Sequence, residues 1–114
     1  MELELRTMTT FDKREEAFEK QFALDQESRF KAVARRNRLL GLWAAEKLGK
    51  SGDEASAYAK EVVAAEFDGT GGAGVIGKVT GDLAAKGAAT NEADVRAKMA
   101  EFMAVAVDQV KAGT

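Results

Sequence analysis

The glycines between residues 69 and 77 come closest to a chemical motif in this sequence. Residues 72–77 fit the G-x-G-x-x-G pattern of dinucleotide-binding proteins, and residues 72–78 fit most of a phosphate-binding P-loop. Both motifs hold phosphate on the amides of a helix that follows a strand. Here the preceding residues, SAYAKEVVAAEF, favour a helix, and Val79 stands where the P-loop needs a hydroxyl. We therefore interpret residues 68–74, DGTGGAG, as a connection whose amides remain able to hold a phosphate in another geometry.

A run of cations is the second chemical signal. Residues 29–38 contain five basic side chains and no acidic one. Clustered arginines on a helix can neutralise phosphates of a nucleotide or a nucleic acid, or they can pair with acids of neighbouring helices. The formal net charge of −2 weighs against nucleic acid. From charge alone, the candidate nucleotide-binding residues are Arg35, Arg36, Arg38 and Lys78.

The composition limits the kinds of site that this chain can build. The sequence of 114 residues has no cysteine and no histidine, so it lacks thiolate chemistry, the commonest metal ligand and the usual proton shuttle at neutral pH. We expect no enzyme and no metal site. No apolar run is long enough to span a bilayer, and the first residues, MELELRT, lack the apolar core of a secretion signal. We expect a cytoplasmic protein.

The elements that would position these residues are predicted to be helices. Proline is absent and alanine is abundant, which favours an all-α fold, a four-helix bundle spanning residues 26–112. The central helix is expected to end at Leu48, with Gly49 as a left-handed stop. Its predicted core face comprises Phe30, Val33, Ala34, Leu40, Ala44 and Leu48, with Trp43 beside them.

Three more helices are predicted after the central one. The first covers residues 53–67 and starts from a capping box of Ser51 and Glu54. The next covers residues 75–86 and the last residues 92–111, capped by Thr90 or Asn91. The expected core residues of these last two helices are Val75, Ile76, Val79 and Leu83, then Val95, Met99, Phe102, Met103, Ala106 and Val110.

The N-terminal residues follow a different pattern. We expect residues 1–7 to be a tag or an upstream extension, and residues 8–25 to form a mobile, partly helical arm. Phe11, Phe18 and Phe22 are spaced to lie along one face of a highly charged helix. These rings either join the core of the domain or anchor an arm that folds into a groove on a partner.

Residues 8–52, MTTFDKREEAFEKQFALDQESRFKAVARRNRLLGLWAAEKLGKSG, resemble the opening of the zeta-subunit inhibitors of the alphaproteobacterial F-type proton-translocating ATP synthase. The segments that carry the resemblance are TFDKREEAFE, FKAVARRNRLLGLWAAEKLG and EASAYAKEVVAAEFD, in the order and spacing of that family. The departure lies at residues 68–74, where the family more often has acids and a proline.

The resemblance implies a function as well as a fold. It implies a small four-helix bundle, monomeric when free and peripheral to the inner membrane, whose N-terminal segment enters the catalytic head between alpha and beta subunits beside gamma. That segment would block ATP hydrolysis more than synthesis. The partner-binding residues would be Phe11, Phe18 and Phe22 as buried anchors, with Arg14, Glu15 and Glu19 setting the orientation.

No cofactor is required on this interpretation, and ADP or ATP would be a regulatory ligand. There are two alternatives. The first is an adenine-nucleotide-binding regulatory helical domain. The second, ranked below it, is a nucleic-acid-binding module.

Overall fold

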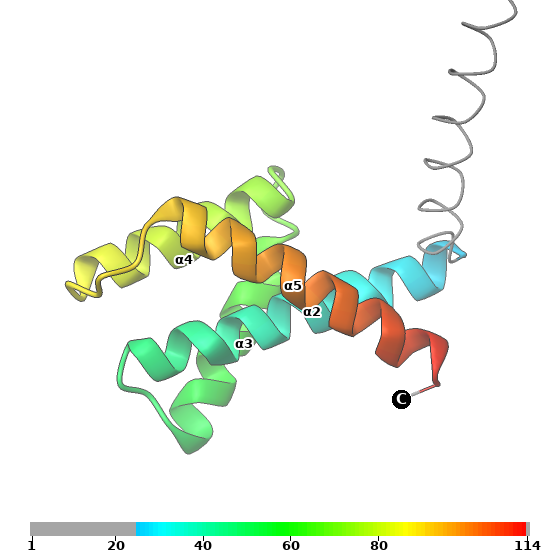
Figure 1. The fold of residues 1–114 in the computed structure, drawn as a ribbon, viewed down its shortest axis with the longest axis horizontal. Helices are drawn as coiled ribbons and strands as arrows, with labels where there is room; N and C mark the ends of the chain where they lie inside the picture. The colour runs from blue at the N-terminus through cyan, green and yellow to red at the C-terminus, as the bar shows by residue number, and fades with distance from the viewer. Residues whose placement is uncertain (1–24, 114) are drawn as a thin grey trace, which may run out of the picture.

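The computed structural model describes residues 25–113, which form four helices and contain no strand (Figure 1). The predicted all-α class and four-helix arrangement are therefore confirmed. The predicted arm, residues 8–25, lies outside the described residues except for Asp25. The helices are α2 (Gln26–Lys47), α3 (Gly52–Ala65), α4 (Gly72–Ala85) and α5 (Glu92–Lys111).

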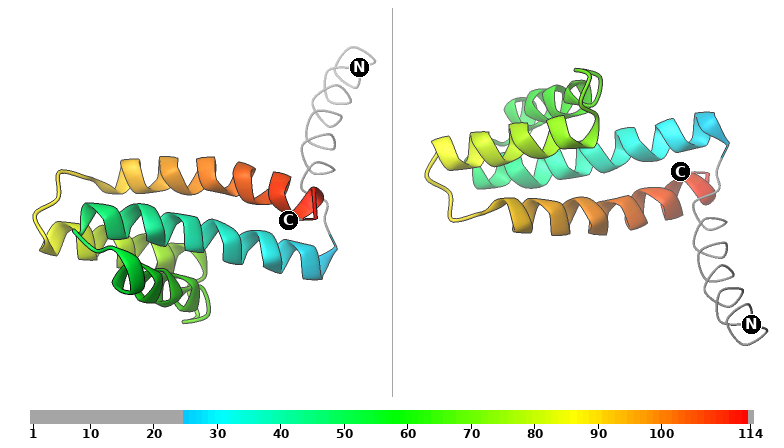
Figure 2. Two further views of the ribbon diagram at one scale, coloured as in Figure 1. Left: turned by 90° about the horizontal axis from the view of Figure 1, so that it is seen from below. Right: turned by 90° about the horizontal axis from the view of Figure 1, so that it is seen from above.

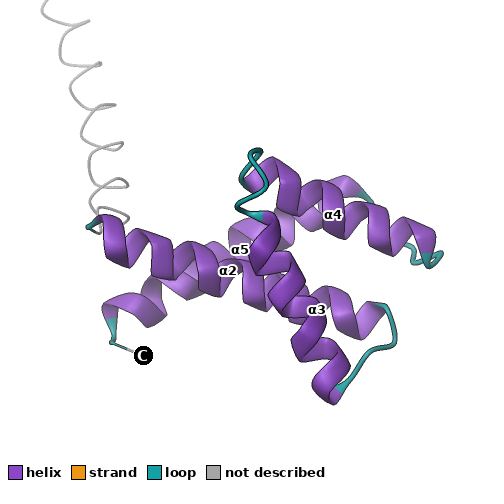
Figure 3. Ribbon diagram, turned by 180° about the vertical axis from the view of Figure 1, so that it is seen from behind, coloured by secondary structure: helices purple, strands orange, loops and turns teal. Residues whose placement is uncertain are grey.

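Helix α2 is the centre of the arrangement. It lies between α5 on one side and α3 on the other, and it makes its most extensive contacts with these two helices (Figure 2). Helix α4 contacts α3, α5 and α2, which closes the bundle at the end away from the described N-terminus (Figure 3). In the part of the chain that the structure describes, no helix is long and apolar enough to cross a membrane.

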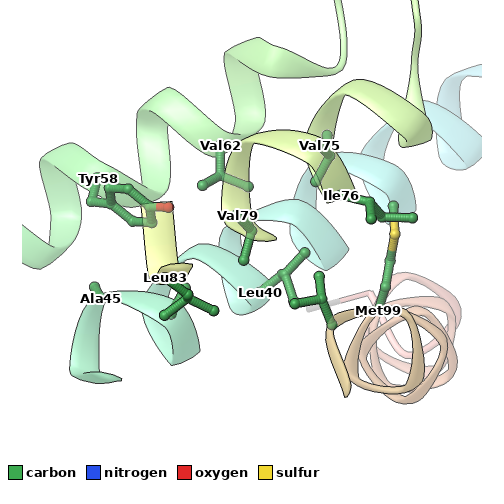
Figure 4. Packing of buried hydrophobic residues seen from close by; sticks show 11 residues of the cluster. Leu40, Ala45, Tyr58, Val62, Val75, Ile76, Val79, Leu83 and Met99 are labelled. Atoms are coloured by element: carbon green, nitrogen blue, oxygen red, sulfur yellow. The ribbon is translucent and has the colours of Figure 1, made fainter. Parts of the chain in front are cut away.

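The main core lies where all four helices meet (Figure 4). The four core positions predicted for the helix at residues 75–86 are confirmed, because Val75, Ile76, Val79 and Leu83 of α4 are all buried. A smaller cluster joins α2 to α5 nearer their other ends and contains Ala32, Ala106 and Val107. The main cluster consists of Leu40, Ala44, Ala45, Tyr58, Val62, Val75, Ile76, Val79, Leu83, Val95 and Met99.

The predicted core face of α2 is wrong at its first turns. Phe30 is 59% exposed, although its spacing placed it on the core side. Helix α2 has 22 residues and α3 only 14, so the start of α2 extends beyond the helix that would cover it. Farther along, α3 approaches so closely that a side chain on Gly41 would come 2.7 Å from the α-carbon of Ala59. Because of this contact, the buried face of α2 differs from the predicted one. Its buried residues are Ala32, Asn37, Leu40, Gly41, Ala44 and Ala45.

Local signals fix three of the helix ends. Asp25 caps α2, since its carboxylate accepts a hydrogen bond of 2.7 Å from the amide of Ser28. Asn91 and Asp94 form a reciprocal capping box at the start of α5. Gly49 has a φ of 77°, as expected for a left-handed stop.

The starts of α3 and α4 differ from the prediction, and α3 ends at Ala65, two residues earlier than predicted. The capping box at Ser51 is wrong, because its side chain makes no capping hydrogen bond. Gly52 follows with a φ of 56°, a conformation that changes how the chain enters α3. Helix α4 begins at Gly72, three residues earlier than predicted, so part of the glycine-rich segment is helical.

Candidate functional site

The predicted partner-binding residues precede the described part of the chain. Phe11, Arg14, Glu15, Phe18, Glu19 and Phe22 all lie outside residues 25–113. The structure does describe the start of α2, which begins one residue after Asp25, and the surface around its first turns (Figure 1). Features on that surface are candidates to serve the segment or its partner.

An apolar groove lies between the first half of α2 and the end of α3, and we call it the α2–α3 groove. Its cavity has a volume of about 150 Å³. Phe30 and Phe67 are 59% and 73% exposed, the largest apolar side chains so exposed among the described residues. Two such side chains around one groove make it a candidate contact surface. The lining residues are Arg29, Phe30, Val33, Ala34, Asn37, Val63, Glu66 and Phe67.

A polar network forms the inner end of the α2–α3 groove. Glu66 accepts hydrogen bonds of 3.2 Å from the guanidinium of Arg36 and 3.2 Å from the amide of Asn37. Arg36 also donates to the amide oxygen of Asn37 at 3.0 Å. Asn37 is fully buried, so its amide group depends on these two partners. The network ties α2 to the end of α3.

Burial of this network affects the charge of Arg36. Its pKa is lowered by desolvation, and the neighbouring Glu66 carboxylate partly offsets this by favouring the cation. A guanidinium keeps its proton even with this shift. For Arg36, the structure therefore shows the predicted alternative of pairing with an acid of a neighbouring element.

The other candidate nucleotide-binding residues have separate surroundings. Arg35 donates a hydrogen bond of 3.4 Å to Gln109 on α5, and Arg38 is exposed on α2. Lys78 lies 3.1 Å from a carboxylate oxygen of Asp82 on its own helix. The structure thus directs Arg35, Arg36 and Lys78 to partners on three different elements.

Lys78 belongs to a cleft of about 370 Å³ between α3 and α4. The hydroxyl of Tyr58 donates a hydrogen bond of 2.8 Å to Asp82, and the Lys78 ammonium lies 5.2 Å from the centre of the Tyr58 ring. Burial, followed by the Asp82 carboxylate, raises the pKa of Tyr58. Tyr58 is therefore a hydrogen-bond donor here and not a base. Lys50, Lys86 and Glu61 complete the polar lining.

The glycine motif lacks the geometry of a nucleotide fingerprint. The element before it is the helix α3, and Gly71, with a φ of 57°, precedes α4. The Asp68 carboxylate packs against the first turn of α4, with its oxygens 2.7 and 2.9 Å from where a β-carbon on Gly74 would lie. Hydrogen bonds from the hydroxyl and amide of Thr70 lower the pKa of Asp68 and keep it ionised. A carboxylate at this position would repel a phosphate.

Sequence reasoning missed Asn37, Glu66 and Phe67 as a group. Asn37 lies three and four residues before Leu40 and Gly41, a spacing that places it on the buried face of α2. No local signal could have paired it with Glu66, which lies 29 residues away. Among the described residues, no group of three acidic side chains is placed to hold a metal ion.

Comparison with known proteins gives a family and a solved structure. The family model of ATPase inhibitor subunit zeta matches residues 8–109. A protein with a solution NMR structure is 56% identical in sequence, with a TM-score of 0.66, and the match covers 75% of this chain and 98% of that one. No curated protein matches the chain.

Proposed function

This chain belongs to the ATPase inhibitor subunit zeta family, and from this membership we propose that it inhibits the F-type ATP synthase through its N-terminal segment. In this proposal residues 8–25 enter the catalytic head between alpha and beta subunits, beside gamma, and wedge it against ATP hydrolysis. The helical body, residues 26–112, holds the segment in position and carries out no covalent chemistry.

The extent of the family match carries this proposal. It begins at residue 8 and so includes the residues that precede the bundle. The two core clusters are built from residues between Ala32 and Val107, so the described helices bury their apolar faces against one another. In this proposal the phenylalanines of residues 8–24 serve a partner and not the bundle. Buried aromatic and arginine side chains are the usual anchors of protein interfaces.

The mechanism follows from differential affinity. A segment that binds one conformation of a rotary enzyme better than the others holds the enzyme in that conformation. Phe11, Phe18 and Phe22 supply apolar area for this, while Arg14 and Glu15 fix the orientation through charged hydrogen bonds. Any ordering of the segment reduces the net affinity, so the anchors have to outweigh that cost.

The test is ATP hydrolysis by the purified cognate enzyme with the full chain added. Phe18→Ser should weaken inhibition at least tenfold, since loss of a buried aromatic anchor costs about 2 kcal/mol or more. Val105→Ser is the matched control, because it removes an exposed apolar side chain from α5. Equal inhibition by the two variants would contradict the role of the segment, and no inhibition by the parent chain would contradict the function.

A second candidate function is binding of ADP or ATP by the free protein. It is favoured by the cleft beside Tyr58, where Lys50, Lys78 and Lys86 outnumber the two acids, Glu61 and Asp82. Titration of the isotope-labelled chain with ADP should then shift NMR signals of these lysines. Shifts around Arg35 and Arg38 instead would place the nucleotide on α2, and the absence of shifts would refute this candidate.

A further inference from the structure

We propose that the α2–α3 groove is a docking site for the N-terminal segment of the same chain, which seats the ring of Phe18 between Phe30 and Phe67. The groove has the size and the lining for one aromatic ring. Its cavity of about 150 Å³ is lined mainly by apolar atoms of Val33, Val63 and the two phenylalanines. An apolar cavity of roughly this size in another protein accommodates benzene, so the groove can take one phenyl ring.

The groove lies close along the chain to the N-terminal segment, which favours this segment as its occupant. Helix α2 begins at Gln26, and Phe30 lies only one turn into it. The 24 residues that precede Asp25 contain three of the six phenylalanines of the chain. A segment tethered this closely reaches the groove at a local concentration on the order of millimolar, far above that of a second molecule in dilute solution. The tether therefore favours the chain's own segment.

Length and register agree with this occupant. If residues 23–25 form the turn of a helical hairpin, a turn of ordinary length, residues 11–22 run antiparallel to residues 26–37. Both stretches then span about 18 Å at the rise of an α-helix. In this register Phe18 lies opposite Phe30, and Glu19 lies opposite Arg29, a groove residue of opposite charge. The same pairing puts Phe11 opposite Asn37, at the inner end of the groove.

Docking in the groove and binding to a partner would use the same face of the segment. Phe18 cannot occupy both sites at once, so the docked state lowers the fraction of chains that are ready to bind. If the segment is docked about nine-tenths of the time, apparent affinity for a partner falls roughly tenfold. This regulatory consequence rests on the proposed function, whereas the docking itself does not.

Paramagnetic NMR on the full chain tests the docking directly. The chain has no cysteine, so Ala17→Cys provides a single site for a nitroxide label beside Phe18. The label should broaden the methyl signals of Val33 and Val63 and leave those of Val105 on α5 unchanged. Phe67→Ser in the same labelled chain should restore the two signals. Sharp signals of Val33 and Val63 in the parent labelled chain would overturn the proposal.

Two further measurements identify any other occupant. When spin-labelled chains are mixed with isotope-labelled chains that carry no spin label, broadening at Val33 would show a second copy in the groove and overturn the proposal. In the ATP hydrolysis assay, Phe67→Ser should inhibit more strongly than the parent, by up to roughly tenfold. Weaker inhibition by Phe67→Ser would show that the groove binds the enzyme instead, which also overturns it. A chain that docks but inhibits nothing would refute only the proposed function.

Discussion

Replacing Glu66 with alanine should destabilise the protein far more than loss of an ordinary surface acid. Glu66 accepts a hydrogen bond of 3.2 Å from Arg36 and another of 3.2 Å from Asn37. The side chains of Arg36 and Glu66 are only 14% and 20% exposed, and Asn37 is fully buried. Alanine would leave a largely buried guanidinium without its counter-charge and a buried amide without its acceptor.

The expected loss of unfolding free energy in Glu66→Ala follows from these exposed fractions. Breaking a fully buried ion pair costs about 3–5 kcal/mol, and leaving a buried donor unsatisfied costs about 1–3 kcal/mol. Water still reaches part of this network and screens the charge, so we expect Glu66→Ala to cost about 2–3 kcal/mol. Glu66→Gln should cost less, since its amide oxygen can still accept from Asn37.

Urea unfolding followed by circular dichroism measures the difference. The midpoint for Glu66→Ala should fall by roughly 1 M or more, given the usual dependence of stability on urea for small domains. Glu101→Ala is the control, because Glu101 pairs with Lys98 at 3.1 Å on the surface of α5 and should contribute at most about 1 kcal/mol. If the two variants unfold at the same urea concentration, the network does not stabilise the bundle as we argue.

Three other predictions concern packing, capping and pH. Gly41→Ala should destabilise the protein by roughly 1–3 kcal/mol, because the added methyl group would come 2.7 Å from a backbone carbon of α3. Gly77→Ala should stabilise it by about 0.5–1 kcal/mol, because the space around Gly77 is open. Melting temperatures that shift in the same direction for both variants would contradict this. Asn91→Ala should cost about 1 kcal/mol and Ser51→Ala almost nothing, since only Asn91 makes a capping hydrogen bond, so equal melting temperatures would refute the assignment. Above pH 10, the ordinary pKa of tyrosine, stability should fall as pH rises, because the raised pKa of Tyr58 keeps the proton in the folded state while the unfolded chain loses it. Tyr58→Phe should remove this part of the pH dependence in urea unfolding, and an unchanged slope would contradict it.

The sequence predicts those parts of the fold that depend on local signals. The last helix was predicted at residues 92–111 and is found at Glu92–Lys111, since Asn91 provides a strong cap and the apolar spacing continues to its end. Gly49 ends the central helix as expected. The four buried positions of α4 were also predicted correctly, because one helical period on a short helix leaves few alternatives.

The wrong or missed predictions concern residues whose burial or pairing depends on elements far away in the sequence. Phe30 has the spacing of a core residue, but its burial depends on the length of α3, which no local pattern near Phe30 contains. Asn37 and Glu66 bond across 29 residues. The partner-binding residues were named from family resemblance and lie outside residues 25–113, so they stay a prediction. The groove beside Phe30 could not be predicted at all, since it forms only where the first half of α2 meets the end of α3.

The most direct test of the central claim is ATP hydrolysis by the purified cognate F-type enzyme with the full chain and with a chain that lacks residues 1–22. Circular dichroism of the shortened chain should show the thermal unfolding of an intact bundle, because the buried residues of both core clusters in residues 25–113 lie between Ala32 and Val107. We predict that the full chain inhibits hydrolysis and that the shortened, folded chain does not. Equal inhibition by the two chains would contradict the account.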